Sequence, residues 1–302
     1  MHTKNHELLI TIDVEPDCDT KWNRSDPLTF ESVLIGIPKI LRPIWNKYGI
    51  KPIYFVSPEV VMNNNCCKVL KQEIKNGAII GAHLHSEYIA PNVTIEDPAG
   101  KPSKEYPCYA HSTKVEYEKI KNLTNLIKKN LSVRPVWYRA ARYGADLDTI
   151  KSLKKLGYKY DSSVTPHINW QSQGGPDHSK APEQPYWILK DDYCKPAANK
   201  SRNIGIKEFP ITISGKRFGI LGRLLPSRWF LYNWIRPTHM TVFEMKRLID
   251  KFDQKYTNPA IVMMFHSMEI MPGKSPFVKT ENERNSFLKR LETIINYVRG
   301  SK

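Results

Sequence analysis

Short runs of β-branched and apolar residues alternate along the chain with segments in which apolar positions recur every three or four residues. The first run, residues 8–12 (LLITI), has the pattern of a buried strand, and Pro16 opposes its continuation beyond the acidic residues that follow. Equivalent runs predict strands at 52–56, 78–85, 135–140, 158–163, 206–213 and 260–265. Helical periodicity predicts helices at 31–48, 66–75, 113–129, 148–156, 241–255 and 283–299.

Three segments modify this simple alternation. Pro38 and Pro43 interrupt the apolar stripe of residues 31–48, which predicts a helix in two pieces. Gly157 predicts the end of the helix at 148–156. Residues 165–203 are rich in Pro, Gly, Gln, Asn and Ser without periodicity, which predicts a long loop of the kind that lines a site.

The 302 residues show no linker, and strands and helices alternate throughout. This pattern predicts one α/β domain over residues 1–302, with six or seven parallel strands. The content of 40% hydrophobic and 25% charged residues is that of a globular protein and excludes a disordered or fibrous chain. In folds of this class, ligands bind beyond the carboxyl ends of the parallel strands.

Polar residues follow most of the predicted strands at that end. Residues two apart in an extended chain point to the same side, so each of the pairs Asp13/Glu15 and His83/His85 aims two polar groups in one direction. The other polar residues at predicted strand ends are Arg139, Arg142, Asp161, Glu208 and His266. We interpret Arg142, Asp161 and Glu208 as structural ion-pairing residues, with shaping of a sugar pocket as the alternative.

Two carboxylates and two imidazoles at one barrel mouth suit a divalent metal such as Zn²⁺, which leaves a coordination position open for water. One carboxylate of the pair can bind the metal while its neighbour accepts a proton from the attacking water. A single carboxylate or histidine in such a place is usually a helix cap or a satisfied core group. The two pairs together, with Arg139 and His266 after two further strands, favour a metal site.

The charge of the chain bears on the partners that the protein could bind. The net charge of +16 and pI near 9.5 indicate either an anionic partner or charge dispersed over solvated faces. The basic residues follow no nucleic-acid-binding motif, so we expect no nucleic-acid partner.

Five cysteines, an odd number without a CxxC motif, fit a reducing cytosol. The beginning of the chain does not resemble a signal peptide, and no apolar stretch is long enough for a transmembrane helix. We therefore expect a cytoplasmic protein.

Basic and aromatic residues are interleaved with aliphatic ones in residues 216–237. That composition suits peripheral contact with an anionic membrane at its inner face. The alternative is a buried helix of the outer ring with arginines extending outward.

Six motifs in order resemble the polysaccharide deacetylases of the NodB-homology type, carbohydrate esterase family 4. They are ITIDVEPD, NGAIIGAHLHSE, VWYRAARYGAD, GYKYDSSVTP, KEFPIT and MMFHSMEIMPGKSP, and they span most of the chain. The DVE and HLH patterns resemble the subgroup associated with surface-polysaccharide or lipopolysaccharide assembly.

The resemblance implies a distorted (β/α)7-type barrel and metal-dependent N-deacetylation. It implies that Asp13 is the general base, that Arg139 steadies Asp13, and that His266 is the general acid. Glu15 and His83 would bind the metal, most simply Zn²⁺. The family has a second histidine four positions after His83, where this chain has Glu87. We expect His85 as the third ligand and keep Glu87 as the alternative.

The implied substrate is an N-acetylated amino sugar in a glycan or lipid-linked glycan. Trp170 and Trp187, within the predicted loop, offer faces for sugar stacking and favour a glycan. One competing interpretation is a related amidohydrolase that acts on a small amide. Another is a non-catalytic carbohydrate-binding protein with the same fold.

Overall fold

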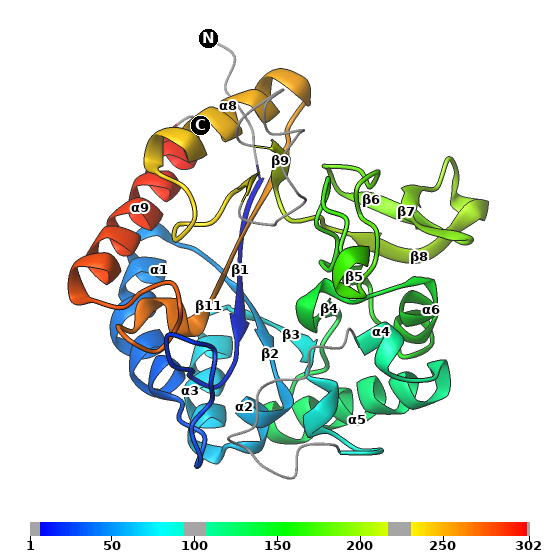
Figure 1. Ribbon diagram of the computed structural model, residues 1–302, viewed down its shortest axis with the longest axis horizontal. Coiled ribbons are helices and arrows are strands. Elements are labelled where there is room, and N and C mark those ends of the chain that lie inside the picture. Colours follow the sequence, from blue (N-terminus) through cyan, green and yellow to red (C-terminus); the bar gives the residue numbers. More distant parts are fainter. Residues whose placement is uncertain (1–6, 94–106, 217–230, 301–302) are drawn as a thin grey trace.

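A curled sheet forms the centre of the computed structural model, which describes residues 7–93, 107–216 and 231–300. Seven neighbouring strands are parallel, and helices cover their outer side (Figure 1), as the alternating pattern predicts. In spatial order they are β11 (Ala260–His266), β1 (Glu7–Val14), β2 (Ile53–Val56), β3 (Ile79–Leu84), β4 (Trp137–Ala140), β5 (Tyr160–Asp161) and β8 (Asn203–Glu208).

The helices form close to where the periodicity predicts them. The 31–48 stripe forms a π-helical segment, η1, followed by a short α-helix, so the prediction of two pieces is confirmed. Side-chain caps such as the Asp146–Thr149 and Thr241–Glu244 capping boxes begin α6 and α8. The helical segments are η1 (Ser32–Leu41), α1 (Arg42–Tyr48), α2 (Pro58–Met62), α3 (Asn64–Lys75), α4 (Pro107–Ala110), α5 (Thr113–Leu131), α6 (Leu147–Lys155), α8 (Val242–Lys255) and α9 (Glu281–Gly300), with short 3₁₀ turns η2 (Ser86–Tyr88), η3 (Ala141–Tyr143), η4 (Gln171–Gln173), η5 (Lys200–Arg202) and η7 (Ser267–Ile270).

Alternate residues of the parallel strands enter two separate hydrophobic clusters. On β2, Tyr54 and Val56 pack in the outer cluster with the helices, whereas Ile53 and Phe55 pack in the inner cluster. Trp137, Trp234 and Met264 also belong to the inner cluster. The interior of the incomplete barrel is therefore filled with side chains, and a site can form only where the strands end.

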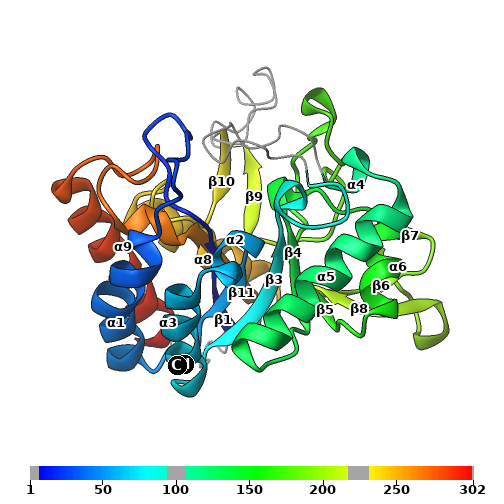
Figure 2. The same cartoon turned by 90° about the horizontal axis from the view of Figure 1, so that it is seen from below.

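The strands that fill the remaining opening are antiparallel. β9 (Ile213–Lys216) pairs with β10 (Tyr232–Trp234), and the two lie side by side in Figure 2. The segment before β9 is tied to β11, because the Thr212 N–H donates to the Val262 carbonyl at 3.1 Å and the Val262 N–H donates to the Thr212 hydroxyl at 2.8 Å. This contact places the segment before β9 beside β11, the edge strand at the other end of the sheet.

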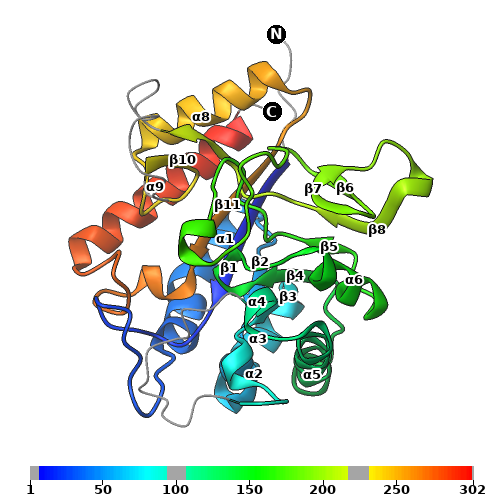
Figure 3. The same cartoon turned by 45° about the vertical axis from the view of Figure 1, so that its right-hand side comes forward.

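Two predictions between residues 165 and 216 are wrong. The expected long loop of residues 165–203 contains the hairpin strands β6 (Tyr186–Leu189) and β7 (Asp192–Pro196), which extend one edge of the sheet (Figure 3). The strand expected at 206–213 is two strands, β8 and β9, separated by a segment that contains Pro210. Strands of four or five residues are too short to give a clear period among many turn-forming residues.

Most of segment 216–237, expected to touch a membrane or form a buried helix, lies outside the described residues. Its described end includes β10, in which Trp234 is 2% exposed, and the next residue, Ile235, is fully buried. These side chains pack in the protein core and are not available to a lipid surface. None of the helices in the described ranges is long and apolar enough to cross a membrane.

Candidate active site

The predicted site residues lie at the carboxyl ends of four parallel strands, on the inner side of the sheet. Asp13 of β1 is paired with His266 of β11, and His83 of β3 is paired with Arg139 of β4. Gly81, two residues before His83, packs so closely that a Cβ there would lie 2.5 Å from the Phe55 ring. Beyond this point, towards the carboxyl ends of the strands, the residues on the inner face are polar instead of apolar.

Asp13 and Arg139 form a buried ion pair. Arg139 is fully buried, and its Nη1 donates to Asp13 Oδ1 at 2.7 Å. The same guanidinium donates to the Ser162 carbonyl and hydroxyl and to the Thr11 hydroxyl, each at 2.9 Å. The guanidinium is thus held in one orientation, and it leaves the second oxygen of Asp13 for other partners.

Glu15, His83 and His85 bring three potential metal-binding atoms together. Glu15 Oε1 is 3.1 Å from His83 Nε2 and 3.4 Å from His85 Nε2. One donor atom from each of the three residues lies within 4.8 Å of the others, and all three residues are buried. Asp13, Glu15 and His266 form a second group that meets the same distance criterion. The two groups share Glu15.

The other ring nitrogen of each histidine is held by the protein. His83 Nδ1 lies 3.0 Å from the carbonyl of Arg139, so it carries the hydrogen and donates. His85 Nδ1 lies 2.8 Å from Glu59 Oε1 and 3.1 Å from Arg24 Nη2, so these two side chains hold the ring in place. Both rings direct Nε2 towards Glu15, which is the orientation of metal-binding histidines in proteins. The donor set therefore fits a divalent cation such as Zn²⁺.

Glu59 and Arg24 complete this side of the site, and sequence reasoning did not find either residue. Glu59 lies in α2, directly after β2, and is 4% exposed. Arg24 Nη1 donates to Glu59 at 2.7 Å, and Arg24 Nη2 lies 3.6 Å from Glu15 Oε2. No motif marks these positions, because they reach the site only through the loops after β1 and β2.

Burial and the neighbouring charges act in opposite directions in this cluster. Burial raises the pKa of Glu15, but the three imidazoles around it outweigh burial and hold the pKa well below its usual value. Burial lowers the pKa of His85, but the Glu59 and Glu15 carboxylates outweigh burial and raise it to about 10. The carboxylates thus require a nearby positive charge, which a proton on His85 or a bound cation can supply.

His266 is held by a carboxylate of its own. Its Nδ1 lies 2.9 Å from Glu269 Oε1, and its backbone N–H donates to the same oxygen at 2.8 Å. Arg236 donates to Glu269 and is itself buried. His266 Nε2 faces the cluster at 3.8 Å from Glu15 Oε1. Sequence reasoning missed Glu269, although a Glu three residues after a strand-ending residue is the spacing of a capping box, which His266 and Glu269 form here.

Glu87, the alternative third ligand, joins neither of the two potential metal-binding groups. It lies in η2, two residues after His85, and is 9% exposed. The buried Lys119 of α5 fixes this turn by donating to the carbonyls of Ser86 at 2.6 Å and Ile89 at 2.7 Å. The geometry therefore favours His85 over Glu87 for the third position.

Asp161 and Glu208 pair with each other, and no basic residue within the described ranges forms an ion pair with either, so the expected structural salt bridges are wrong for both. The two carboxyls lie on the paired ends of β5 and β8 and are fully buried. Asp161 accepts from Ser163 at 2.7 Å and Tyr193 at 2.9 Å, and Glu208 accepts from the Val164 N–H at 3.0 Å. Arg142 is exposed with a φ of 53°.

Burial raises the pKa of both Asp161 and Glu208, and the charge of Asp161 raises that of Glu208 further. No donor in the described part of the chain reaches Glu208 Oε2, and we infer that a proton shared with Asp161 satisfies it. Because the folded state holds this proton and the unfolded state releases it near pH 4, stability falls as the pH rises above that value.

We therefore expect Glu208→Gln, whose amide donates its own hydrogen, to flatten the decline of the melting temperature between about pH 5 and 9. Thermal melts across this range measure the effect. Glu118→Gln, at a half-exposed residue paired with Lys121, is the matched control and should melt as the wild type does at each pH. Parallel curves for Glu208→Gln and wild type would contradict a shared proton.

Trp170 and Trp187, expected as sugar-stacking residues, differ in exposure. Trp170 is 6% exposed, and its indole N–H donates to the Thr165 hydroxyl at 2.8 Å, so its faces are covered. Trp187 is 47% exposed but belongs to β6, in the hairpin that extends the far edge of the sheet.

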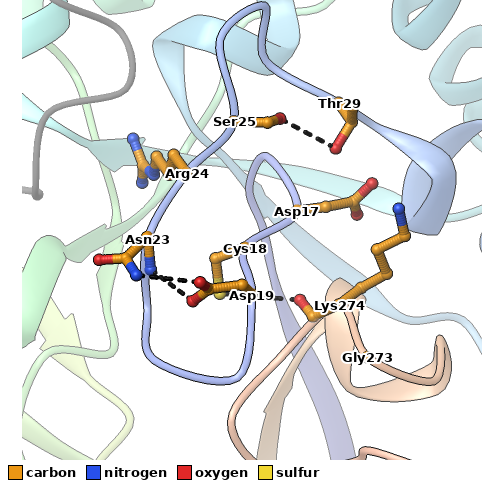
Figure 4. Close-up of a pocket in the computed structure, with 9 residues that line it drawn as sticks. All are labelled: Asp17, Cys18, Asp19, Asn23, Arg24, Ser25, Thr29, Gly273 and Lys274. Atoms are coloured by element: carbon orange, nitrogen blue, oxygen red, sulfur yellow. Dashed lines mark hydrogen bonds between the residues drawn. The ribbon is translucent and has the colours of Figure 1, made fainter.

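A polar pocket of about 280 Å³ lies beside the loop that follows β1 (Figure 4). Its side chains mostly satisfy one another or the backbone. Asp19 accepts from Asn23, Ser25 donates to Thr29 at 3.4 Å, and Lys274 donates to Glu31 at 2.7 Å. These contacts give the loop its shape. The pocket is lined by Asp17, Cys18, Asp19, Asn23, Arg24, Ser25, Thr29, Gly273 and Lys274.

Known structures share this fold, although no protein-family model and no curated protein matches the sequence. A protein of Parabacteroides distasonis, provisionally classed as a glycoside hydrolase/deacetylase, aligns with 98% of this chain and 67% of its own at 11% identity and a TM-score of 0.65. A protein of Mycobacterium smegmatis, provisionally classed as a polysaccharide deacetylase, aligns with 99% of this chain and 91% of its own at 14% identity and a TM-score of 0.55. The chain therefore has the incomplete (β/α)7-like barrel fold of these deacetylase-type proteins.

Proposed function

We propose that the chain, as a single domain over residues 1–302, is a metal-dependent hydrolase that removes the N-acetyl group from an amino sugar. The observation that carries the proposal is the convergence of Asp13, Glu15, His83, His85 and His266 at one end of the barrel. The fold shared with deacetylase-type proteins and the six sequence motifs support the same reaction. Fold likeness alone is compatible with many activities, so the side-chain cluster carries the proposal.

His83, His85 and Glu15 would hold the cation, with zinc the metal that suits two imidazoles and one carboxylate. When bound, such an ion polarises a carbonyl and lowers the pKa of water. Glu59 and the Arg139 carbonyl hold the two imidazoles in the orientation that this role requires. Arg24, which contacts both Glu59 and Glu15, keeps the carboxylates in place.

Asp13 is the proposed general base, and His266 is the proposed general acid. Arg139 binds one oxygen of Asp13 and keeps that carboxylate oriented, so the other oxygen can accept a proton from the attacking water. Glu269 and Arg236 both contact Nδ1 of His266 at 2.9 Å, which directs Nε2 to the side of the cluster. From that position Nε2 can donate a proton to the leaving nitrogen, which leaves as an amine while acetate is formed.

The substrate proposed is an N-acetylated amino sugar within a glycan or lipid-linked glycan, including one of surface-polysaccharide or lipopolysaccharide assembly. The net charge of +16 suits a substrate or carrier that is anionic.

Acetate release from a panel of substrates tests the proposal. Purified protein loaded with Zn²⁺ is incubated with N-acetylglucosamine oligomers, a nucleotide N-acetyl sugar, an N-acetylated glycolipid and a small cyclic amide. We expect acetate from at least one of the sugars and none after chelation of the metal. Turnover of only the cyclic amide would point to a small-amide hydrolase, and binding of a glycan without release would point to a carbohydrate-binding protein.

We expect Glu59→Gln to weaken metal affinity by about 10–100-fold, because the glutamine amide orients His85 less strongly than a carboxylate does. Competition with a chromophoric chelator measures the affinity. Glu73→Gln is the matched control, since Glu73 is a buried glutamate paired with Arg42. If Glu59→Gln bound the metal as tightly as Glu73→Gln does, Glu59 would have no role in orienting the metal ligands.

A further inference from the structure

We propose that Trp22 is the surface on which the sugar ring of the substrate stacks, beside His266. This inference rests on the proposed deacetylase function, because it takes the sugar as the ligand of this site. Trp22 lies in the turn between Cys18 and Arg24, in the loop that follows β1.

The indole of Trp22 borders the proposed acid and is open to solvent. Its ring centroid lies 5.7 Å from that of His266, with an interplanar angle of 74°, and 5.5 Å from that of Phe277, with an angle of 82°. Both neighbours thus meet it edge to face. The side chain is nevertheless 38% exposed. An exposed indole face is suited to the apolar C–H face of a sugar ring, and this one adjoins the group proposed to protonate the leaving nitrogen.

The backbone holds the indole there at a conformational cost. Trp22 has a φ of 65°, in the left-handed region that bulky residues rarely adopt. The Asp19 carboxylate stabilises the turn by accepting from the N–H groups of Lys21 at 2.7 Å and Asn23 at 2.9 Å. Strained residues of this kind persist where the surroundings hold them, and they are concentrated at functional sites.

Both ends of the turn are attached to the candidate site. At one end, the Cys18 N–H donates to the carbonyl of Lys274 at 3.1 Å, and the Cys18 thiol lies 3.4 Å from the sulfur of Met268, two residues after His266. At the other end, Arg24 donates to Glu59, the partner of His85. The turn therefore fixes the distance from the indole to both the proposed acid and the potential metal ligands.

The reaction kinetics of Trp22→Ala and Trp22→Phe test the inference. The substrates are the best sugar of the acetate-release panel and 4-nitrophenyl acetate, an ester without a sugar. We expect Trp22→Ala to raise KM for the sugar about tenfold or more and to leave kcat and the ester reaction within about twofold of wild type, since only the sugar loses a stacking surface. Trp22→Phe, which keeps a ring, should recover most of the affinity. An equal loss of kcat on both substrates would mean that Trp22 only positions His266 and would overturn the inference.

A binding measurement separates this inference from the proposed function. Chitotetraose and UDP-N-acetylglucosamine are titrated calorimetrically into wild type, Trp22→Ala and Trp187→Ala. Weakened binding in Trp22→Ala alone supports the inference, even if the wild type releases no acetate and the proposed function fails. Unchanged binding in Trp22→Ala, weakening only in Trp187→Ala, or no binding of either sugar by the wild type would overturn it, even where acetate release succeeds.

Discussion

Asn in place of Asp13 is expected to lower kcat for acetate release by about 10²–10⁴-fold, the usual contribution of a positioned base. The amide oxygen of Asn can still accept the hydrogen bond from Arg139, which is 2.7 Å from Asp13 in the wild type. The amide cannot take a proton from water at neutral pH. The variant should therefore keep its fold and its metal while it loses turnover, which initial rates, metal analysis and a thermal melt together measure.

The matched control is Asp148→Asn, at an exposed carboxylate that pairs with Lys151 on α6. It should turn over at the wild-type rate. Removing the charge of Asp13 leaves the fully buried guanidinium of Arg139 without its counterion, so a lowered melting temperature is expected only for Asp13→Asn. Turnover by folded Asp13→Asn within tenfold of wild type would mean that another group is the base.

Sequence periodicity was sufficient to predict the parallel part of the fold. The strands that carry Asp13, His83, Arg139 and His266 are largely buried runs rich in apolar residues, and each ends at the polar residue or one residue after it. Because parallel strands put their carboxyl ends at one edge, adjacency of these side chains followed from the pattern before their register was known. The hairpin of β6 and β7 was not predictable in this way, because its short strands lie among Pro, Gly and Asn.

The residues that orient the site were beyond sequence reasoning for a different reason. Glu59 lies in α2 directly after β2 and Arg24 lies in the loop after β1, and they meet His85 only because both segments lie over the same end of the barrel. A lone Glu after a proline is usually a helix-start residue, as Glu59 also is in α2. The pairing of Asp161 with Glu208 likewise depends on the register of β5 against β8 and on complete burial. The local sequence around these residues indicates neither the register of the strands nor the burial of the two carboxyls.

Among the candidate ligands, His83 is expected to matter most for the metal. We predict that His83→Ala lowers the metal content of the purified protein from about one equivalent to below about 0.1 and lowers acetate release by about 10³-fold. His83 is 3% exposed, and the Arg139 carbonyl holds its Nδ1, so its Nε2 is directed at Glu15 and alanine removes that ligand atom without changing the other residues of the group. Elemental analysis and the acetate assay measure the two effects.

A chelator distinguishes the effect of losing the metal from the effect of losing the His83 side chain on the stability of the fold. A ligand that binds only the folded state at a hundred times its Kd stabilises that state by about 2.7 kcal/mol. A chelator should therefore lower the melting temperature of the wild type by several degrees and leave that of His83→Ala unchanged. His167→Asn is the matched control, because His167 is a partly exposed histidine paired with Glu183 outside the cluster, and asparagine tolerates its φ of 70°. It should respond to the chelator as the wild type does. A full equivalent of tightly held metal in His83→Ala would place the ion elsewhere and remove the physical basis of the proposed reaction.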